Sequence, residues 1–250
     1  MTGFGFGVSE KVLNEKLCGD VASLVFDDTG TQDLSGLLAS LPDTDFSREN
    51  LNTLLAYGPE PENWRVGEAL AECFLKECHD CYFPWPDVRD ERKRGSSLPG
   101  ADLVGFQQHN GYERFVFGEV KTSSHEAYPP SAVYGRHGLK QQIEDLRDRR
   151  DICDGLVRYL GYRAAQANWR DRFQAAAKVY LNEPYEIRLF GLLVRDVEPN
   201  EDDLRVRVSS LTKGCPDKMV ITMVALYLPS ASITSLASKV VASRKNGGGS

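Results

Sequence analysis

Four ionisable side chains have the types and spacing of a site that hydrolyses phosphodiester bonds. Glu68 lies in an apolar segment with helical spacing, and Asp102 opens the apolar stretch ADLVGFQ. Glu119 and Lys121 end a second apolar stretch, RFVFGEVK. Two neighbouring carboxylates raise each other's pKa unless a cation lies between them, and Mg²⁺ suits that place because it prefers oxygen ligands. A bound metal activates water for attack on phosphorus, and a nearby lysine can orient that water or stabilise developing charge.

A predicted hairpin between the two apolar stretches brings three of these groups together. The pair Asn110-Gly111 is typical of a two-residue turn between antiparallel strands. Counting outward from that turn places Asp102 opposite Glu119, and directly opposed side chains have Cβ atoms about 5 Å apart. Side chains two apart share a face of the strand, so Lys121 lies beside Glu119. We therefore expect Asp102, Glu119 and Lys121 on one patch of surface.

Glu68 is the fourth member of the predicted site. It lies on the helix before the sheet, in the segment RVGEAL. A carboxylate there is placed to bind a metal or to position a water. We expect Asp102, Glu119 and Glu68 to be ligands of Mg²⁺ (or Mn²⁺), and Lys121 to assist the attacking water.

The elements that must position these groups predict an α/β fold with a mixed central sheet flanked by helices. The order helix, three strands, helix, strand is typical of a helix crossover in such a fold. We expect an N-terminal extension over residues 1–60 that packs on the core, a catalytic domain over 61–245, and a linker-like tail, NGGGS, at 246–250. The predicted helices cover 48–57, 63–77, 138–178 (broken near Gly155 or Gly161) and 231–243. The predicted strands cover 81–85, 101–107, 114–121, 186–194, 204–210 and 218–228, with a loop at 87–99.

The motif Gly-Ala-Asp at 100–102, followed by Glu-Val-Lys at 119–121, resembles the PD-(D/E)XK nuclease superfamily. The resemblance covers about residues 63–160. It implies an α-β-β-β-α-β core and Mg²⁺-dependent cleavage of phosphodiesters, with DNA as substrate. The literal Pro-Asp pair occurs at Pro86-Asp87. We favour Asp102, because it opens an apolar strand and has a hairpin partner, whereas Asp87 lies in a charged loop.

Residues after the motif are candidates for substrate binding. Gln141 and Gln142 open the following helix, where several members of the superfamily place a glutamine near the active site. Lys140 and Arg136 are close in sequence, and basic groups around a carboxylate cluster are what contact with a phosphate backbone requires. Lys140, Gln141 and Arg136 are therefore expected to contact substrate.

The segments EALAECFL, GADLVGF and FGEVKTSS are similar to the nuclease subunit of Hachiman-type bacterial anti-phage systems. This resemblance implies DNA as the target and a helicase or ATPase protein as the partner. It also implies that the nuclease is restrained until the partner senses aberrant DNA.

The bulk composition excludes several classes of protein. The net charge of −6 argues against a protein that coats nucleic acid by bulk charge. There is no apolar run long enough to span a membrane, no signal-peptide pattern and no phosphate-binding loop of a motor ATPase. Six irregularly spaced cysteines do not predict a disulfide framework. We expect a cytoplasmic protein with no membrane association.

Four alternatives stay open. An Asp–Glu–Lys patch is often a solvated salt-bridge cluster, although Glu119 ends a strand that should be buried, and buried carboxylates need a partner. Cys73, Cys78, His79 and Cys81 invite a zinc site, but only one C-x-x-C pair is present, and buried thiols are favoured. The chain can also be a catalytically silent subunit that docks on a helicase-containing complex. Finally, it can be an RNA nuclease of the same fold, since sequence does not reveal contacts to a 2′-hydroxyl.

Overall fold

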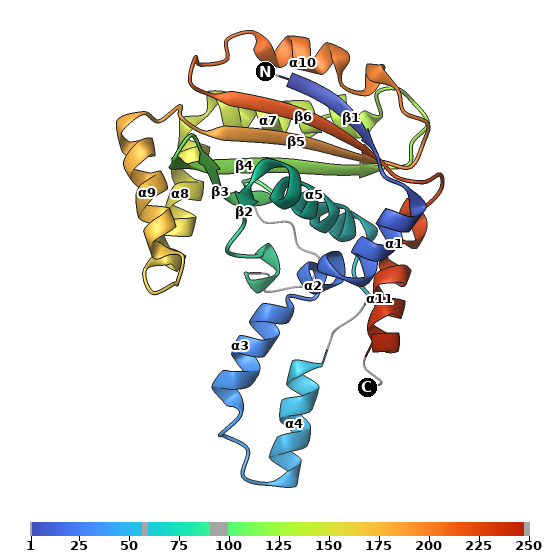
Figure 1. Ribbon diagram of the computed structural model, residues 1–250, viewed down its shortest axis with the longest axis vertical. Helices are drawn as coiled ribbons and strands as arrows, with labels where there is room; N and C mark the ends of the chain where they lie inside the picture. Colours follow the sequence, from blue (N-terminus) through green and yellow to red (C-terminus); the bar gives the residue numbers. More distant parts are fainter. Residues whose placement is uncertain (1, 57–59, 91–99, 248–250) are drawn as a thin grey trace.

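The computed structural model has an α/β architecture built on one mixed sheet of six strands (Figure 1). It describes residues 2–56, 60–90 and 100–247. The strand order is β1-β6-β5-β4-β3-β2. Strands β1, β6, β5 and β4 run parallel, β3 pairs antiparallel with β4, and β2 pairs antiparallel with β3. The strands are β1 (Thr2–Gly7), β2 (Cys81–Tyr82), β3 (Leu103–His109), β4 (Tyr112–Ser123), β5 (Arg188–Arg195) and β6 (Val220–Tyr227).

Helices cover both faces of the sheet and enclose two apolar layers. One face packs against α1 (Glu10–Cys18), α2 (Asp20–Val25), α5 (Asn63–His79) and α11 (Leu236–Gly247), through residues such as Leu13, Val66 and Leu75. The other face packs against α6 (Ser131–Tyr134), α7 (Leu139–Asp148), α8 (Arg150–Ala164), α9 (Arg170–Asn182) and α10 (Arg205–Thr212). The predicted fold class, a mixed sheet flanked by helices, is confirmed.

The hairpin of β3 and β4 has the register expected from its turn. Leu103 pairs with Gly118 and His109 with Tyr112. Asn110 and Gly111 have φ values of 48° and 84°, the positive values at both central positions that a type I′ turn requires. Alternation along β4 sends Phe115 and Phe117 into the layer beneath α7–α9, whereas Val116 and Val120 pack beneath α5. By the same alternation Glu119 and Lys121 share the face that carries Phe115 and Phe117.

Two helices project from the body as an arm (Figure 1). They are α3 (Asp28–Leu38) and α4 (Asp45–Leu55), and no residue of either is buried. Thr44 begins α4 with a capping box, in which its side chain and that of Ser47 each accept from the other's backbone N–H. The helix predicted over 48–57 is thus present, and it begins three residues earlier.

Several predicted elements are wrong in type or in position. The sequence predicts a strand over residues 204–210, yet α10 covers Arg205–Thr212. The reason is topological: β5 and β6 are parallel neighbours, and such strands need a crossover, which is usually helical. The long region at 138–178 breaks at Arg149 and between α8 and α9, whereas Gly155 and Gly161 lie inside α8.

The structure also contains short elements that the sequence did not predict, or predicted with other bounds. Residues 2–7 were not expected to be a strand, yet β1 pairs with β6 and makes the N-terminal segment part of the sheet. The strand predicted at 81–85 is only two residues long, and residues 87–89 form the 3₁₀ turn η1 (Asp87–Arg89). Two further short turns are η2 (Glu201–Asp203) and η3 (Ile233–Ser235). Residues 91–99 of the predicted loop and 248–250 of the tail lie outside the described residues.

Within the described parts of the chain, none of the helices has the length and apolar character needed to cross a membrane.

Candidate active site

The hairpin brings Asp102, Glu119 and Lys121 together at the end of the sheet. The Lys121 Nζ atom lies 3.5 Å from Glu119 Oε2 and 3.9 Å from Asp102 Oδ2. The backbone N–H of Val120 donates to Asp102 Oδ2 at 2.8 Å, which fixes that carboxylate between β3 and β4. One ammonium therefore faces two carboxylates supplied by a single hairpin.

Glu119 is the most unusual of these groups. Its side chain is only 1% exposed, and its Oε2 atom has no hydrogen-bond partner among the residues that the structure describes. Burial, and then the charge of Asp102, raise the pKa of Glu119 to about 9, despite the opposing effect of Lys121. A buried carboxylate in such surroundings favours a proton or a cation over free ionisation.

Glu68 approaches the same cluster from α5. It forms an ion pair with Arg65, one turn earlier, at 3.2 Å. Burial, and then the nearby charge of Asp102, raise the pKa of Glu68 to about 8. Asp102 is therefore the common neighbour of two carboxylates, Glu119 on β4 and Glu68 on the helix.

A glycine lets α5 come close enough for this. A Cβ atom on Gly67 would lie 2.0 Å from Thr122 Oγ1 and 3.2 Å from Thr122 Cβ. The helix backbone thus packs directly on β4, one residue before Glu68 and one residue after Lys121.

Replacing Gly67 with alanine is expected to destabilise the protein by about 1–3 kcal/mol, because the added methyl group overpacks this contact. The double variant Gly67→Ala/Thr122→Ala removes the Thr122 hydroxyl that clashes, and should recover most of the loss. Urea unfolding measures both. Gly36→Ala is the matched control, since a Cβ there meets nothing within 4 Å; equal losses at the two glycines would contradict the packing argument.

Asp87 is a fourth carboxylate that the structure adds to the cluster. It lines a small cavity of about 40 Å³ together with Glu68 and Asp102. Burial raises the pKa of Asp87 to about 7, with Asp102 adding to the rise and Arg65 opposing it. The sequence signal was its literal Pro-Asp pair, which we assigned to a charged loop. The structure brings Asp87 and Asp102 to one place, so the two did not need to be alternatives.

A set of ion pairs holds the η1 turn that carries Asp87. Arg89 donates to both carboxylate oxygens of Asp27, at 2.6 and 2.8 Å. On the other side, Asp90 accepts from Trp85, Tyr159 and Arg163 at 2.9, 2.7 and 2.5 Å. Burial alone would raise the pKa of Asp90, but these donors lower it below its usual range. The turn is thus tied to the root of the arm and to α8.

A larger cavity of about 520 Å³ adjoins the cluster, with Asp87 in its lining. Gln142 on α7 also lines it, and the Gln142 Oε1 atom is buried without a hydrogen-bond partner in the described structure. Gln141, the glutamine that we predicted to contact substrate, is exposed and donates to Asp145 at 3.1 Å. The geometry therefore favours Gln142 over Gln141 as the glutamine of the site.

The two basic residues that we predicted to contact substrate, Lys140 and Arg136, are close in sequence to residues that line this cavity. Lys140, on the first turn of α7, donates to Glu144 at 2.7 Å. Arg136 is exposed in the segment between α6 and α7. Neither contacts the carboxylate cluster in any interaction that the structure records, so their assignment to substrate stays a prediction.

The donor set can be compared with what a metal ion needs. Among the described residues, no three His, Cys, Asp or Glu side chains converge closely enough to hold a metal by themselves. Mg²⁺, however, is usually bound through one or two carboxylates and completes its shell with waters and substrate phosphates. The Asp102–Glu119 pair, in which Glu119 Oε2 accepts no hydrogen bond from the described residues, fits that pattern. Of the thiols considered for zinc, Cys73 and Cys81 are buried and Cys78 is exposed.

Neither a protein-family model nor a curated protein sequence matches this chain. The function must therefore be argued from the arrangement of Asp102, Glu119 and Lys121.

Proposed function

We propose that the chain is a metal-dependent nuclease that hydrolyses phosphodiester bonds in DNA. The observation that carries the proposal is the Asp102–Glu119–Lys121 cluster. A hairpin places two carboxylates side by side and buries one of them, Glu119, whose Oε2 atom has, among the described residues, no hydrogen bond and only the Lys121 ammonium at 3.5 Å as an ionic neighbour. Burial of a carboxylate beside a second carboxylate, with one ammonium shared between the two, is costly. A site that binds a divalent cation explains why the sequence keeps it.

Asp102 and Glu119 would hold Mg²⁺ or Mn²⁺, and Glu68 would support them from α5. When bound, the ion would supply Lewis-acid stabilisation of charge on the phosphate and would make water more acidic. Lys121 faces both carboxylates. In this proposal its ammonium orients the attacking water and stabilises negative charge that develops on the phosphate.

Binding of the substrate would fall to groups around the larger cavity. Gln142 lines it and has an amide oxygen without a hydrogen-bond partner in the described structure, and Lys140, Arg136 and Gln141 would contact phosphates at its margin. The net charge of −6 gives the chain little nonspecific attraction for DNA. Part of the affinity for nucleic acid would therefore come from a partner.

The similarity to the nuclease subunit of Hachiman-type systems supports a role in anti-phage defence with a helicase or ATPase protein. In that role the nuclease acts on DNA that the partner selects. A catalytically silent docking subunit and an RNA nuclease of the same fold are the competing outcomes that the assay must separate.

The first test is cleavage of supercoiled plasmid DNA and of a matched RNA with Mg²⁺, Mn²⁺ or EDTA, alone and with any helicase encoded beside the chain. We expect metal-dependent nicking of DNA, reduced at least a hundredfold by Lys121→Met, since the lysine acts on charge in the transition state.

The matched control is Lys218→Met. Lys218 also pairs with a glutamate, Glu183, at 2.9 Å, but this pair is exposed on the surface and is distant in sequence from the cluster. If the chain cleaved only the RNA, the proposed substrate would be RNA in place of DNA. No cleavage under any condition, with no Mg²⁺ bound in calorimetry, would leave the silent docking subunit.

A further inference from the structure

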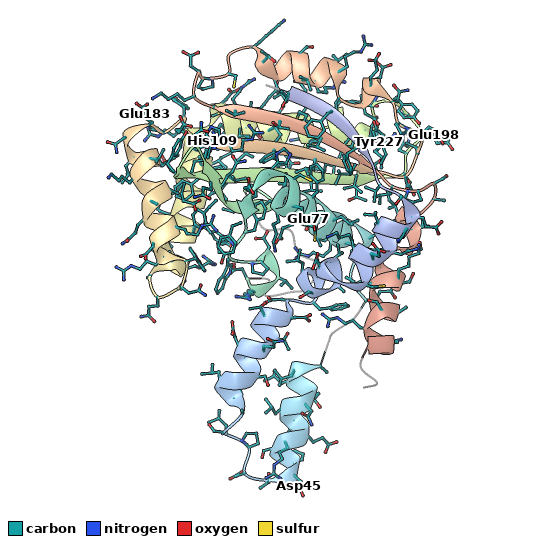
Figure 2. The ribbon with its side chains drawn as sticks, in the orientation of Figure 1. Asp45, Glu77, His109, Glu183, Glu198 and Tyr227 are labelled. Atoms are coloured by element: carbon teal, nitrogen blue, oxygen red, sulfur yellow. The ribbon has the colours of Figure 1, made fainter. Side chains whose placement is uncertain are left out.

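The arm formed by residues 28–55 lies apart from the body and the candidate site (Figure 1). It consists of α3, the loop after it, and α4. The two helices contact each other, yet neither of them has a buried residue. Figure 2 shows Asp45 at the far end of the arm, away from the sheet. An element that contributes so little to the core needs another reason to be kept.

Large apolar side chains are exposed on the arm, most of them near its tip. Leu37 is 74% exposed, Leu41 68%, and Phe46 74%, and Leu54 is exposed closer to the root. Single exposed apolar residues are ordinary, but several gathered on one projecting element are typical of an interaction surface. Aromatic and aliphatic groups that enter pockets on a partner carry most of the energy of such interfaces.

The charge of the arm restricts what can bind it. Residues 28–55 hold five acidic side chains, Asp28, Asp33, Asp43, Asp45 and Glu49, against the single base Arg48. Asp45 pairs with Arg48 and Asp28 with Arg244, which leaves Asp33, Asp43 and Glu49 to set the charge of the arm. Nucleic acid and anionic lipid surfaces would be repelled by this charge. A second copy of the arm would be repelled as well. A surface with basic groups around an apolar groove is complementary to it.

The root of the arm is held firmly. Asp27 accepts the backbone N–H of Gly30 and so caps α3, while the same carboxylate pairs with Arg89 on the η1 turn. Asp28 forms an ion pair with Arg244 of α11. These contacts hold the start of α3 against η1 and α11, and a preformed attachment lowers the entropy that is lost on binding.

We propose that the arm is a docking site for a separate protein that presents an apolar groove rimmed by lysine or arginine side chains. Phe46, Leu37 and Leu41 enter the groove, and Asp43 faces its basic rim. The experiment that tests this docking site measures binding, so its result does not depend on whether the chain cleaves DNA.

The test begins with photo-crosslinking in cells of the organism that makes the chain. Leu37 is replaced by p-benzoylphenylalanine, and Leu181, which is 81% exposed on α9, is replaced in a parallel sample. We expect one discrete protein adduct from position 37 and none of that mass from position 181. The captured protein is identified by mass spectrometry, purified, and titrated against the full chain by calorimetry.

Phe46→Glu should weaken that binding at least tenfold, and Asp43→Lys several-fold, whereas Leu181→Glu should leave it unchanged. Raising the salt concentration should weaken the wild-type complex, because exposed charges are screened. Both arm variants should keep the wild-type melting temperature, since neither side chain is buried. An adduct with a second copy or with nucleic acid, no adduct specific to position 37, or full affinity in Phe46→Glu would each overturn the proposal.

Discussion

Replacing Glu119 with glutamine is expected to abolish metal-dependent cleavage and, at pH 8, to make the metal-free protein more stable. Glutamine keeps the shape of the side chain but removes the charge that binds a cation. Loss of a metal ligand removes several kcal/mol of stabilisation from the transition state, which corresponds to at least a hundredfold in rate. A residue needed only for the fold would not combine lower activity with higher stability.

The gain in stability follows from the pKa of Glu119, which burial and Asp102 raise to about 9 from a usual value of 4.5. Between these values the carboxyl is protonated in the folded protein and ionised in the unfolded chain. The unfolded state thus binds fewer protons, and stability falls as the pH rises through this window. The variant lacks this loss, so its advantage should grow from pH 5 to pH 9, by at most about 1.4 kcal/mol per pH unit.

Urea unfolding at pH 5, 7 and 9, with Mg²⁺ or with EDTA, measures this advantage. Mg²⁺ should stabilise the wild type, because it binds only the folded state, and should not stabilise Glu119→Gln. Glu113→Gln is the matched control on the same strand, where the glutamate instead pairs with Arg172 at 2.8 Å. If Glu119→Gln kept full activity, or lost stability at every pH, the metal-binding role of Glu119 would be wrong.

Replacing Arg195 with methionine should cost about 3–5 kcal/mol of stability, the largest structural effect that we expect. Arg195 is fully buried at the end of β5. Its Nε atom lies 3.3 Å from Asp203 Oδ2, and its other nitrogens donate to the carbonyls of His125 and Ala127 at 2.6 and 3.1 Å. Methionine fills the space but leaves two carbonyls without this donor and the buried Asp203 carboxylate with only the Tyr227 hydroxyl, at 2.9 Å, among the described side chains.

The double variant Arg195→Met/Asp203→Asn should recover part of this loss, because it removes the stranded charge. Arg205→Met is the surface control: Arg205 pairs with Asp202 at 2.6 Å, yet it is 60% exposed, and exposed pairs contribute little. Equilibrium denaturation of the four proteins gives the comparison. Similar losses for Arg195→Met and Arg205→Met would contradict the assignment.

The local parts of the site could be predicted from the sequence because local chemistry determines them. Asn110-Gly111 specifies the turn, the turn sets the register, and the register brings Asp102 to Glu119. Burial of the strand that carries Phe115 and Phe117 was visible as an apolar run, so a buried Glu119 was expected. Each of these steps joins residues that lie within one hairpin.

The parts that could not be predicted depend on distant segments. Asp87 joins the cluster because Arg89 pairs with Asp27, far earlier in the chain, and Asp90 with residues of α8. Gln142 rather than Gln141 faces the cavity because the rotation of α7 is set by its packing on the sheet. Likewise β1 was not predicted, because Gly3, Gly5 and Gly7 are of a type that is depleted in strands. It forms because it pairs with the edge of β6.

The local origin of the Asp102–Glu119 pair also has a consequence for the order of folding. A hairpin closed by two residues costs little loop-closure entropy, whereas the parallel pairing of β4 with β5 and of β5 with β6 must first bring distant segments together. The two carboxylates should therefore meet early, while water still screens their repulsion. Pulse-labelled amide exchange during refolding should show protection of residues 103–118 before residues 189–194. The acidic pair would then be assembled first and desolvated last, when the crossover helices dock over it.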